Sequence, residues 1–452
     1  MNRKQTDDQG AAEAFGCMLA GIGFLIVGLV RMVSDISTSV PKGITVGTYH
    51  TNVGFKKTVG IPHDARLKHT HVVGATGTGK TTLLKNLIIQ DIRDGNGLAV
   101  IDPKGDLIDE ILAHVPESRF QDVIICDPTD TEYPIGFNIF EYVAESDRSR
   151  TASEIISIFK KLFGSTWGYR LENILRNTVL ALLEVPGSTL LDIPDFFINE
   201  DFRNGLLVNV TNFSVLNFWK TEFVTYSDSE VRQAIRPILT RINPWMSYPE
   251  IRNVIGQEYT SFSIRRIMDE RKILLVNIPH GAVGEDMSHL LGAVMVSKIQ
   301  LTAMSRTGQK APFYLYVDEF QNFITSAFEK ILTEARSFGL GIIMSNQYLE
   351  QLPKSLSLAI EKNIAVRLTC TMEGSQHRLR YETPQDELLD DLVVHPLKPP
   401  RPGNKHAVAE IRTMCRSRYA QPRPEVESDI MGRFNRRRTV HTASDESSFW
   451  GE

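Results

Sequence analysis

The stretch GATGTGKT, Gly74–Thr81, decides the fold of this 452-residue chain. It satisfies the phosphate-loop pattern G-x-x-x-x-G-K-[ST], follows the apolar run His71–Val73 and precedes a helical pattern at Thr82–Arg93. Glycines in such a loop let backbone N–H groups curl around phosphate oxygens at the positive end of a helix. The loop and its context therefore predict a nucleotide site between a buried strand and a helix.

Two side chains of this loop predict the ligands, ATP and Mg²⁺. Lys80 is placed to reach the β and γ phosphates, and the Thr81 hydroxyl is placed to bind the metal ion. Thr78 and Thr82 are neighbours without an assigned role. The predicted cofactor-binding residues are Gly74, Ala75, Thr76, Gly77, Thr78, Gly79, Lys80, Thr81 and Thr82.

An acidic pair supplies the second carboxylate that such a metal ion needs. The run YLYVDE, Tyr314–Glu319, ends an apolar strand in Asp318, the candidate metal ligand, and in Glu319, which can polarise a water for attack on the γ-phosphate. An Asp-Glu pair after a strand is also typical of a helix start. The phosphate loop upstream favours the catalytic interpretation.

Three further polar residues have two interpretations each. The strand GIIMSNQ ends in Asn346 and Gln347, whose amides lie beside Asp318 if the two strands are neighbours. They are then γ-phosphate sensors, and otherwise a polar turn. Arg336 in TEARSFG either reaches a neighbouring subunit's nucleotide as an arginine finger or caps the C-terminal end of its helix.

Short apolar runs alternate with helical patterns along the chain, which predicts an α/β fold with a parallel sheet. Between Phe140 and Arg271 the strand signals stop and apolar residues recur at helical spacing, which predicts an inserted all-helical domain. The strand candidates are His71–Val73, Leu98–Ile101, Val123–Cys126, Ile273–Ile278, Phe313–Val317, Gly341–Ser345 and Ile364–Leu368.

These patterns divide the chain into six parts. They are a tail at 1–13, a transmembrane anchor at 14–33, a Ser-, Thr-, Pro- and Gly-rich linker at 34–58, an ATPase core at 59–140 and 271–395, the helical insertion at 141–270, and a Pro-rich segment with a basic and polar tail at 396–452.

The anchor is predicted from Ala14–Val30, which carries no charge and sits at the short end of what crosses a bilayer. Extending it to Val33 requires Arg31 to snorkel. Acidic residues before the segment oppose a cleaved signal peptide, and a buried or peripheral helix is the remaining alternative. We expect a retained single-pass span.

The net charge of −4 and the pI of about 6.3 exclude a protein that coats nucleic acid with its whole surface. Four scattered cysteines without a CxxC pair are typical of a reduced, cytosolic chain. Local DNA contact has four candidates, Lys104, Arg232, Arg236 and Arg241, each with a solvated surface as its alternative. The basic tail Arg433–Arg438 favours a solvated or protein-docking segment over a DNA reader.

Taken together, four motifs in this order resemble the HerA/FtsK superfamily, and within it the TraG/TraD-like coupling ATPases of conjugation and type IV secretion. They are GATGTGKT, then IDPKGDL (Ile101–Leu107), YLYVDEFQNF (Tyr314–Phe323) and ILTEARSFGLGIIMSNQYLEQL (Ile331–Leu352). The resemblance covers about Val59–Leu368. It implies a RecA-like motor domain with an inserted helical domain, a hexameric ring, and ATP-driven passage of DNA.

The resemblance also implies residue roles and a location. Better-known members carry two membrane helices, whereas this sequence has one candidate near its N-terminus, so direct docking to an inner-membrane channel is in doubt. If the family topology holds, the anchor lies in the cytoplasmic membrane with the ATPase domain in the cytoplasm. The implied roles are Lys80 and Thr81 on phosphate and Mg²⁺, Asp318 on the metal, Glu319 on water, Gln347 as sensor and Arg336 as arginine finger.

Three functions remain open at this stage. The first is a DNA translocase, for single- or double-stranded DNA, that works with relaxase and secretion-channel proteins. The second is a HerA-like motor for repair or packaging. The third is a receptor that docks protein cargo to a secretion machine and uses ATP as an assembly switch.

Overall fold

The computed structural model describes residues 43–447 apart from 51–53, 142, 309, 325–327, 329–331, 333 and 384–391, and apart from the side chains of 335, 336 and 436–447. The predicted anchor at 14–33 lies outside these residues. In the part of the chain that is described, no helix is both long enough and apolar enough to span a membrane.

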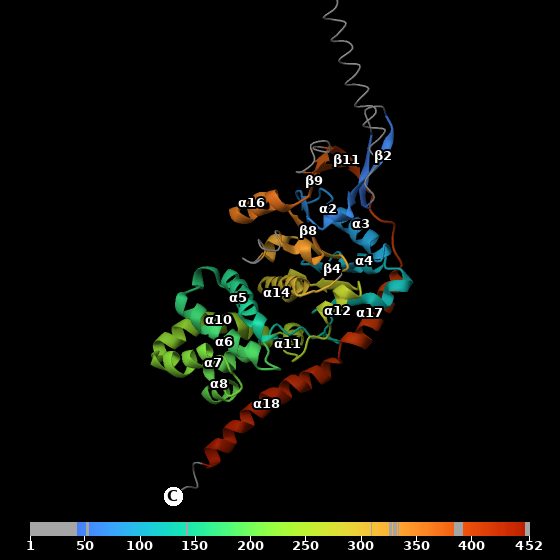
Figure 1. Cartoon of the computed structure of the whole chain (residues 1–452). Coiled ribbons are helices and arrows are strands. Elements are labelled where there is room, and N and C mark those ends of the chain that lie inside the picture. The colour runs from blue at the N-terminus through green and yellow to red at the C-terminus, as the bar shows by residue number, and fades with distance from the viewer. Residues whose placement is uncertain are drawn as a thin grey trace, which may run out of the picture.

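An eleven-stranded sheet with the order β2-β1-β11-β10-β9-β3-β8-β7-β4-β6-β5 forms the centre of the molecule (Figure 1). Its strands are β1 (Gly43–His50), β2 (Lys56–Pro62), β3 (Thr70–Val73), β4 (Gly97–Asp102), β5 (Val123–Cys126), β6 (Ile273–Asn277), β7 (Phe313–Val317), β8 (Leu340–Asn346), β9 (Val366–Glu373), β10 (Gln376–Glu382) and β11 (Leu392–Pro396).

The seven strands from β9 to β5 in this order pair in parallel, which confirms the α/β class with a parallel sheet. Every residue of β4, β6 and β7 is buried, because helices cover both faces of the sheet. Successive side chains point to opposite faces. Ala99 and Ile101 therefore belong to one buried cluster, and Leu98 and Val100 to the other.

The rest of the sheet differs from the prediction. Strands β9, β10, β11, β1 and β2 pair antiparallel, so the sheet is mixed. All of β1 and the first three residues of β2 fall in 34–58, where the sequence predicts a linker. In β1 only Ile44, Val46 and Gly47 are buried, and half-buried strands give a weaker apolar signal than the continuous runs of the parallel core.

The helices form two groups on the two sheet faces. Helices α3, α4 and α17 contribute to one buried cluster, while α12, α14, α16 and the helices between β5 and β6 contribute to the other. The α-helices are α2 (His63–Arg66), α3 (Lys80–Arg93), α4 (Ile108–Leu112), α5 (Glu145–Phe163), α6 (Tyr169–Glu184), α7 (Asp192–Ile198), α8 (Glu200–Leu207), α9 (Phe213–Asn217), α10 (Asp228–Ser247), α11 (Pro249–Ile255), α12 (Ile264–Asp269), α13 (His280–Val283), α14 (Glu285–Met304), α16 (Lys354–Asn363), α17 (Lys405–Tyr419) and α18 (Arg423–Ser447).

Helices α5 to α12 make up the helical region, Glu145–Asp269, which Figure 1 shows gathered to one side of the sheet. The chain enters it after β5 and returns through β6, and these two strands are neighbours at one end of the sheet order. The helical region therefore connects to the core through its edge.

The C-terminal part of the chain is also more ordered than the predicted Pro-rich segment and polar tail. Helix α17 packs Ile411 and Cys415 against the sheet, and α18 runs past α11 (Figure 1) with Ile430 buried. Arg433, the first residue of the basic stretch, is 7% exposed and donates to the carbonyl oxygens of Gly187 and Gly256. This arginine therefore links α18 to the loops at Gly187 and Gly256 and is not solvated.

A buried ion pair joins α2, α3 and β7. The Arg66 guanidinium donates to both carboxylate oxygens of Asp91, at 2.8 and 2.5 Å, and lies 3.6 Å from the centre of the Tyr314 ring. Tyr316 donates to the same carboxylate at 2.5 Å. With Arg66 and Asp91 at 1% and 0% exposure, each charge depends on its partner.

We expect Arg66→Met to lower the free energy of unfolding by about 3–5 kcal/mol, because it leaves the Asp91 charge buried without a partner. Urea unfolding followed by circular dichroism measures this. The matched control is Arg232→Met, since Arg232 is 72% exposed and lies 3.9 Å from an exposed carboxylate. Equal unfolding midpoints for the two variants would contradict the role given to the buried pair.

Candidate nucleotide site

The predicted site residues follow four strands, β3, β8, β7 and β4, that lie side by side in the sheet. The phosphate loop follows β3, and the acidic pair follows β7. Gln347 comes directly after β8, and Lys104 comes two residues after β4. Because the strands are parallel, their carboxyl ends meet at one edge, which is where ligands bind in open α/β sheets.

The phosphate loop closes on its own lysine. Lys80, the first residue of α3, is 6% exposed, and its ammonium donates to the carbonyl oxygens of Gly74 at 2.5 Å and Ala75 at 3.2 Å. Gly77 and Gly79 have φ values of 83° and 97°, in the left-handed region that side chains disfavour. The loop therefore curls at its glycines around the end of the lysine side chain.

Strands β9 and β10 support this loop from behind. A Cβ atom on Gly74 would lie 2.6 Å from both the carbonyl oxygen of Cys370 and the Thr78 hydroxyl. His377 of β10 places its Nδ1 3.1 Å from the carbonyl oxygen of Thr78. The antiparallel part of the sheet thus fixes the position of the loop.

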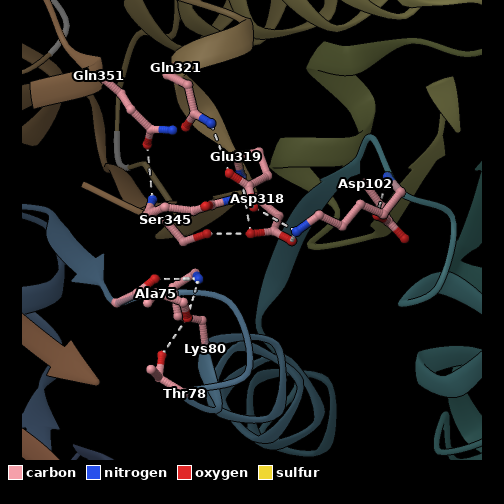
Figure 2. A network of polar contacts seen from close by, with 12 residues as sticks. Ala75, Thr78, Lys80, Asp102, Asp318, Glu319, Gln321, Ser345 and Gln351 are labelled. Atoms are coloured by element: carbon pink, nitrogen blue, oxygen red, sulfur yellow. Dashed lines mark hydrogen bonds and ion pairs between the residues drawn. The ribbon is translucent and has the colours of Figure 1, made fainter. Parts of the chain in front are cut away.

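Asp318 is held by neighbouring donors at the end of β7. It is 3% exposed, and its Oδ1 accepts hydrogen bonds from the Ser345 hydroxyl and, at 3.0 Å, from the backbone N–H of Glu319. Its Oδ2 lies 3.8 Å from the Lys104 ammonium. The carboxylate therefore has a fixed orientation, and Figure 2 shows it across from Lys80.

Glu319 receives three hydrogen bonds and adopts an uncommon backbone conformation. Its carboxylate accepts from Lys104 at 2.6 Å, Gln321 at 2.8 Å and Gln347 at 3.3 Å. Its φ of 46° lies in the left-handed region, where non-glycine residues concentrate at functional sites. Burial raises the pKa of Glu319, but the donors and the Lys104 charge outweigh it and bring the pKa below its usual value.

Lys104, predicted as a DNA contact, lies instead in this site. The carboxylate of Asp102 accepts from the backbone N–H groups of Lys104 at 2.9 Å and Leu107 at 2.8 Å, which fixes the turn after β4. The ammonium then reaches Glu319 and Asp318. Burial lowers the pKa of Lys104, and the carboxylates raise it above its usual value.

The two amides at the end of β8, Asn346 and Gln347, have different partners. Asn346 is buried, its Oδ1 accepts a hydrogen bond from Nε2 of His71 at 2.7 Å, and its amide nitrogen donates to the carbonyl oxygen of Tyr348 at 2.6 Å. Burial lowers the pKa of His71 to about 4, so the ring is neutral at pH 7 and donates this bond. The Asn346 side chain is therefore bonded to His71 of β3, and Gln347 is the amide that reaches Glu319 of the acidic pair.

The chain matches the model of the type IV secretion-system coupling protein DNA-binding domain over residues 56–372, more than half its length. It belongs to this family. No curated protein matched the chain.

Solved structures of the bacterial conjugative coupling protein TrwB share the fold. The unbound form lacking 70 N-terminal residues is 17% identical, with a TM-score of 0.55, over 83% of this chain and 92% of that one. TrwB with the non-hydrolysable ATP analogue ADPNP is 18% identical, with a TM-score of 0.54, over 81% and 84%. TrwB with ADP and Mg²⁺ is 18% identical, with a TM-score of 0.52, over 83% and 86%.

The remaining predicted residues of this coupling protein have different outcomes. Thr81 and Thr82 lie in the first turn of α3, partly exposed. Arg336 lies in the short helix η6 (Ala335–Phe338), and its side chain is outside the described residues. Arg241 of α10 pairs with Asp286 of α14, which replaces its predicted DNA role with a link between the helical region and the core.

Sequence reasoning missed three residues that position the coupling protein's site, Gln321, Ser345 and His377. Gln321 stands two residues after Glu319, and Ser345 is a polar residue in an otherwise apolar strand, so both carried a local signal. His377 lies on β10, about 300 residues after the loop it contacts, and no local pattern indicates it.

We expect Gly74→Ala to shift the phosphate loop of the coupling protein and to lower the free energy of unfolding by about 1–3 kcal/mol, because the added methyl group overlaps the backbone of β9. Thermal unfolding and the affinity for a fluorescent ATP analogue measure the two effects. The control is Gly205→Ala in α8, where a Cβ meets nothing within 4 Å and alanine favours the helix. A Gly74→Ala variant as stable as this control would contradict the close approach.

Proposed function

We propose that this coupling protein hydrolyses ATP and uses the energy to move DNA at the cytoplasmic membrane during type IV secretion or conjugative transfer. The observation that carries the proposal is the position of Glu319, an ionised carboxylate held by Lys104, Gln321 and Gln347 beside the metal-ligand candidate Asp318. A site that only bound nucleotide would not need this second, oriented carboxylate.

The residues present fit ATP and Mg²⁺. The curled loop offers backbone donors at the start of a 14-residue helix, and Lys80, the Thr81 hydroxyl and the Asp318 carboxylate are the groups that bind phosphate and a hard cation. The TrwB structures with ADPNP and with ADP and Mg²⁺ support the same ligands here. Mg²⁺ neutralises charge that develops on the phosphate oxygens.

In this mechanism Glu319 orients the attacking water and accepts its proton. Its lowered pKa keeps the carboxylate ionised at neutral pH. Gln347, already bonded to Glu319, is the amide proposed to contact the γ-phosphate and report its loss. Arg336 is proposed to complete the nucleotide site of a neighbouring subunit in a homohexamer, so that each subunit hydrolyses ATP only within the assembled ring.

The DNA contact is proposed to be local and repeated around the ring. Arg232 and Arg236 stay exposed on α10, one turn apart, and line an open groove of about 780 Å³ with Tyr248. A ring repeats these two cations in every subunit, so a chain with a net negative charge can still bind the phosphate backbone of DNA. Residues 14–33 are the proposed membrane anchor, with the core in the cytoplasm and relaxase and channel proteins as partners.

We expect the full-length protein in detergent to hydrolyse ATP faster when DNA is added. Glu319→Gln should keep its affinity for an ATP analogue and lose about 10²–10⁴-fold in turnover, because the water loses its base. Lys80→Ala should lose nucleotide binding, since the phosphates lose their cation. The control is Glu350→Gln, an exposed carboxylate near the same edge, which should match the wild type.

Phosphate release with single-stranded DNA, double-stranded DNA and no DNA measures these effects. Normal turnover by Glu319→Gln would show that another group is the base. Turnover that responds to protein cargo but not to DNA would replace the DNA motor with the receptor function.

Lys104→Met should move the acid limb of the pH profile of kcat to higher pH. Glu319 must be ionised to accept a proton, so kcat falls as the pH drops through its pKa. Removing the Lys104 charge raises the pKa of Glu319, because burial is then opposed only by the hydrogen bonds from Gln321 and Gln347. Lys104→Arg keeps the charge and should keep the acid limb near that of the wild type, whereas an unmoved limb in the methionine variant would contradict the electrostatic role.

A further inference from the structure

The end of α5 reaches from the helical region to the turn that follows Glu319. This turn is the short helix η5 (Phe320–Asn322). The ammonium of Lys161 donates to the carbonyl oxygens of Gln321 at 2.8 Å and Asn322 at 2.9 Å. A side chain of the helical region thus bonds directly to the backbone that carries the carboxylate and its glutamine partner.

The residues whose carbonyls Lys161 holds are also hydrogen-bonded to Glu319, so a displacement of these carbonyls would displace Glu319. Inside it, the N–H of Asn322 donates to the carbonyl of Glu319 at 3.0 Å. Phe320 is fully buried and fixes one side of the turn, with its ring 6.0 Å from that of His71. Gln321 carries both a carbonyl held by Lys161 and an amide that donates to Glu319, so the two bonds share one residue.

The two lysines at this end of α5 have different surroundings. Lys160 is 61% exposed and lies 3.7 Å from the Glu172 carboxylate within the helical region. Lys161 is also exposed to solvent, but its ammonium bonds to the two backbone carbonyls of the turn, and partial desolvation lowers its pKa to about 8. The two neighbouring lysines therefore differ in their partners, a carboxylate of the helical region for Lys160 and the backbone of the turn for Lys161.

We propose that Lys161 is a positioning residue that couples the placement of the helical region to the geometry of Glu319. When α5 holds the turn, Glu319 and Gln321 are aligned for hydrolysis, and a displacement of α5 misaligns them. A polyanion bound to the helical region would act on hydrolysis through this bond. The inference rests on the proposed function, because it takes Glu319 as the catalytic base.

The experiment compares Lys161→Ala with Lys160→Ala in the full-length protein. Lys161→Ala should lower kcat roughly 10- to 100-fold with an unchanged KM for ATP, because misplacing a catalytic group by about 1 Å has an effect of this size. Lys161→Arg keeps a donor and should recover most of kcat. Lys160→Ala should match the wild type in kcat and in the stimulation of turnover by DNA.

Two further readouts separate positioning from loss of stability. In the Glu319→Gln background, Lys161→Ala should cause no further loss, because both act through the same carboxylate. Amide hydrogen exchange in residues 319–323 should rise in Lys161→Ala and not in Lys160→Ala, and this measurement does not depend on ATP turnover. Normal turnover by Glu319→Gln would remove the proposed function, whereas unchanged exchange and kcat in Lys161→Ala would overturn the role of Lys161.

Discussion

The parallel register of four strands is the constraint on which the site depends. Because β3, β8, β7 and β4 are neighbours and run in the same direction, the loops after them open at one edge. These strands are buried almost throughout, so their ends have little freedom to shift. Lys80, Lys104, Asp318 and Gln347 come from four separate segments of the sequence, and the order and direction of the strands bring them together.

This dependence explains which parts of the site could be predicted from the sequence. The phosphate loop and the acidic pair are local, since each sits where an apolar run ends, and the structure brings them to one edge. The partner of Lys104 could not be predicted, because it depends on β4 lying beside β7, and strand order has no local signal. Asn346 and Gln347 looked equivalent, yet one is still inside β8 and faces His71, and the other lies past the strand.

The same reasoning applies to the fold. The continuous apolar runs located six of the seven parallel strands to within one residue because those strands are buried on both faces, whereas the run for β9 ended five residues early, where that strand becomes exposed. Strands β1 and β2 and helices α17 and α18 were missed because each is buried only in part, which leaves a weaker apolar signal than that of the parallel core. In α18 the apolar contacts of Val426 and Ile430 are spaced at four residues within a strongly charged sequence. One-sided burial leaves a pattern that is easily taken for a linker or a tail.

The proposed role of Lys161 depends on how the helical region is connected to the sheet, which is at one end of the strand order. Strands β5 and β6, which lead into and out of the region, lie at the opposite end of the parallel core from β3 and its phosphate loop, so a shift of the helices need not break the pairing beneath the nucleotide site. The region nevertheless contacts the core again at two places. Lys161 bonds to the turn after β7, and Arg241 of α10 pairs with Asp286 of α14. In the proposed coupling, movement at the helices would be passed on through Lys161 to the turn that carries Glu319, while the strands that position Lys80 and Asp318 stay in register. The proposed motor function requires this separation, because the phosphate site must remain intact while the proposed base, Glu319, moves into and out of alignment.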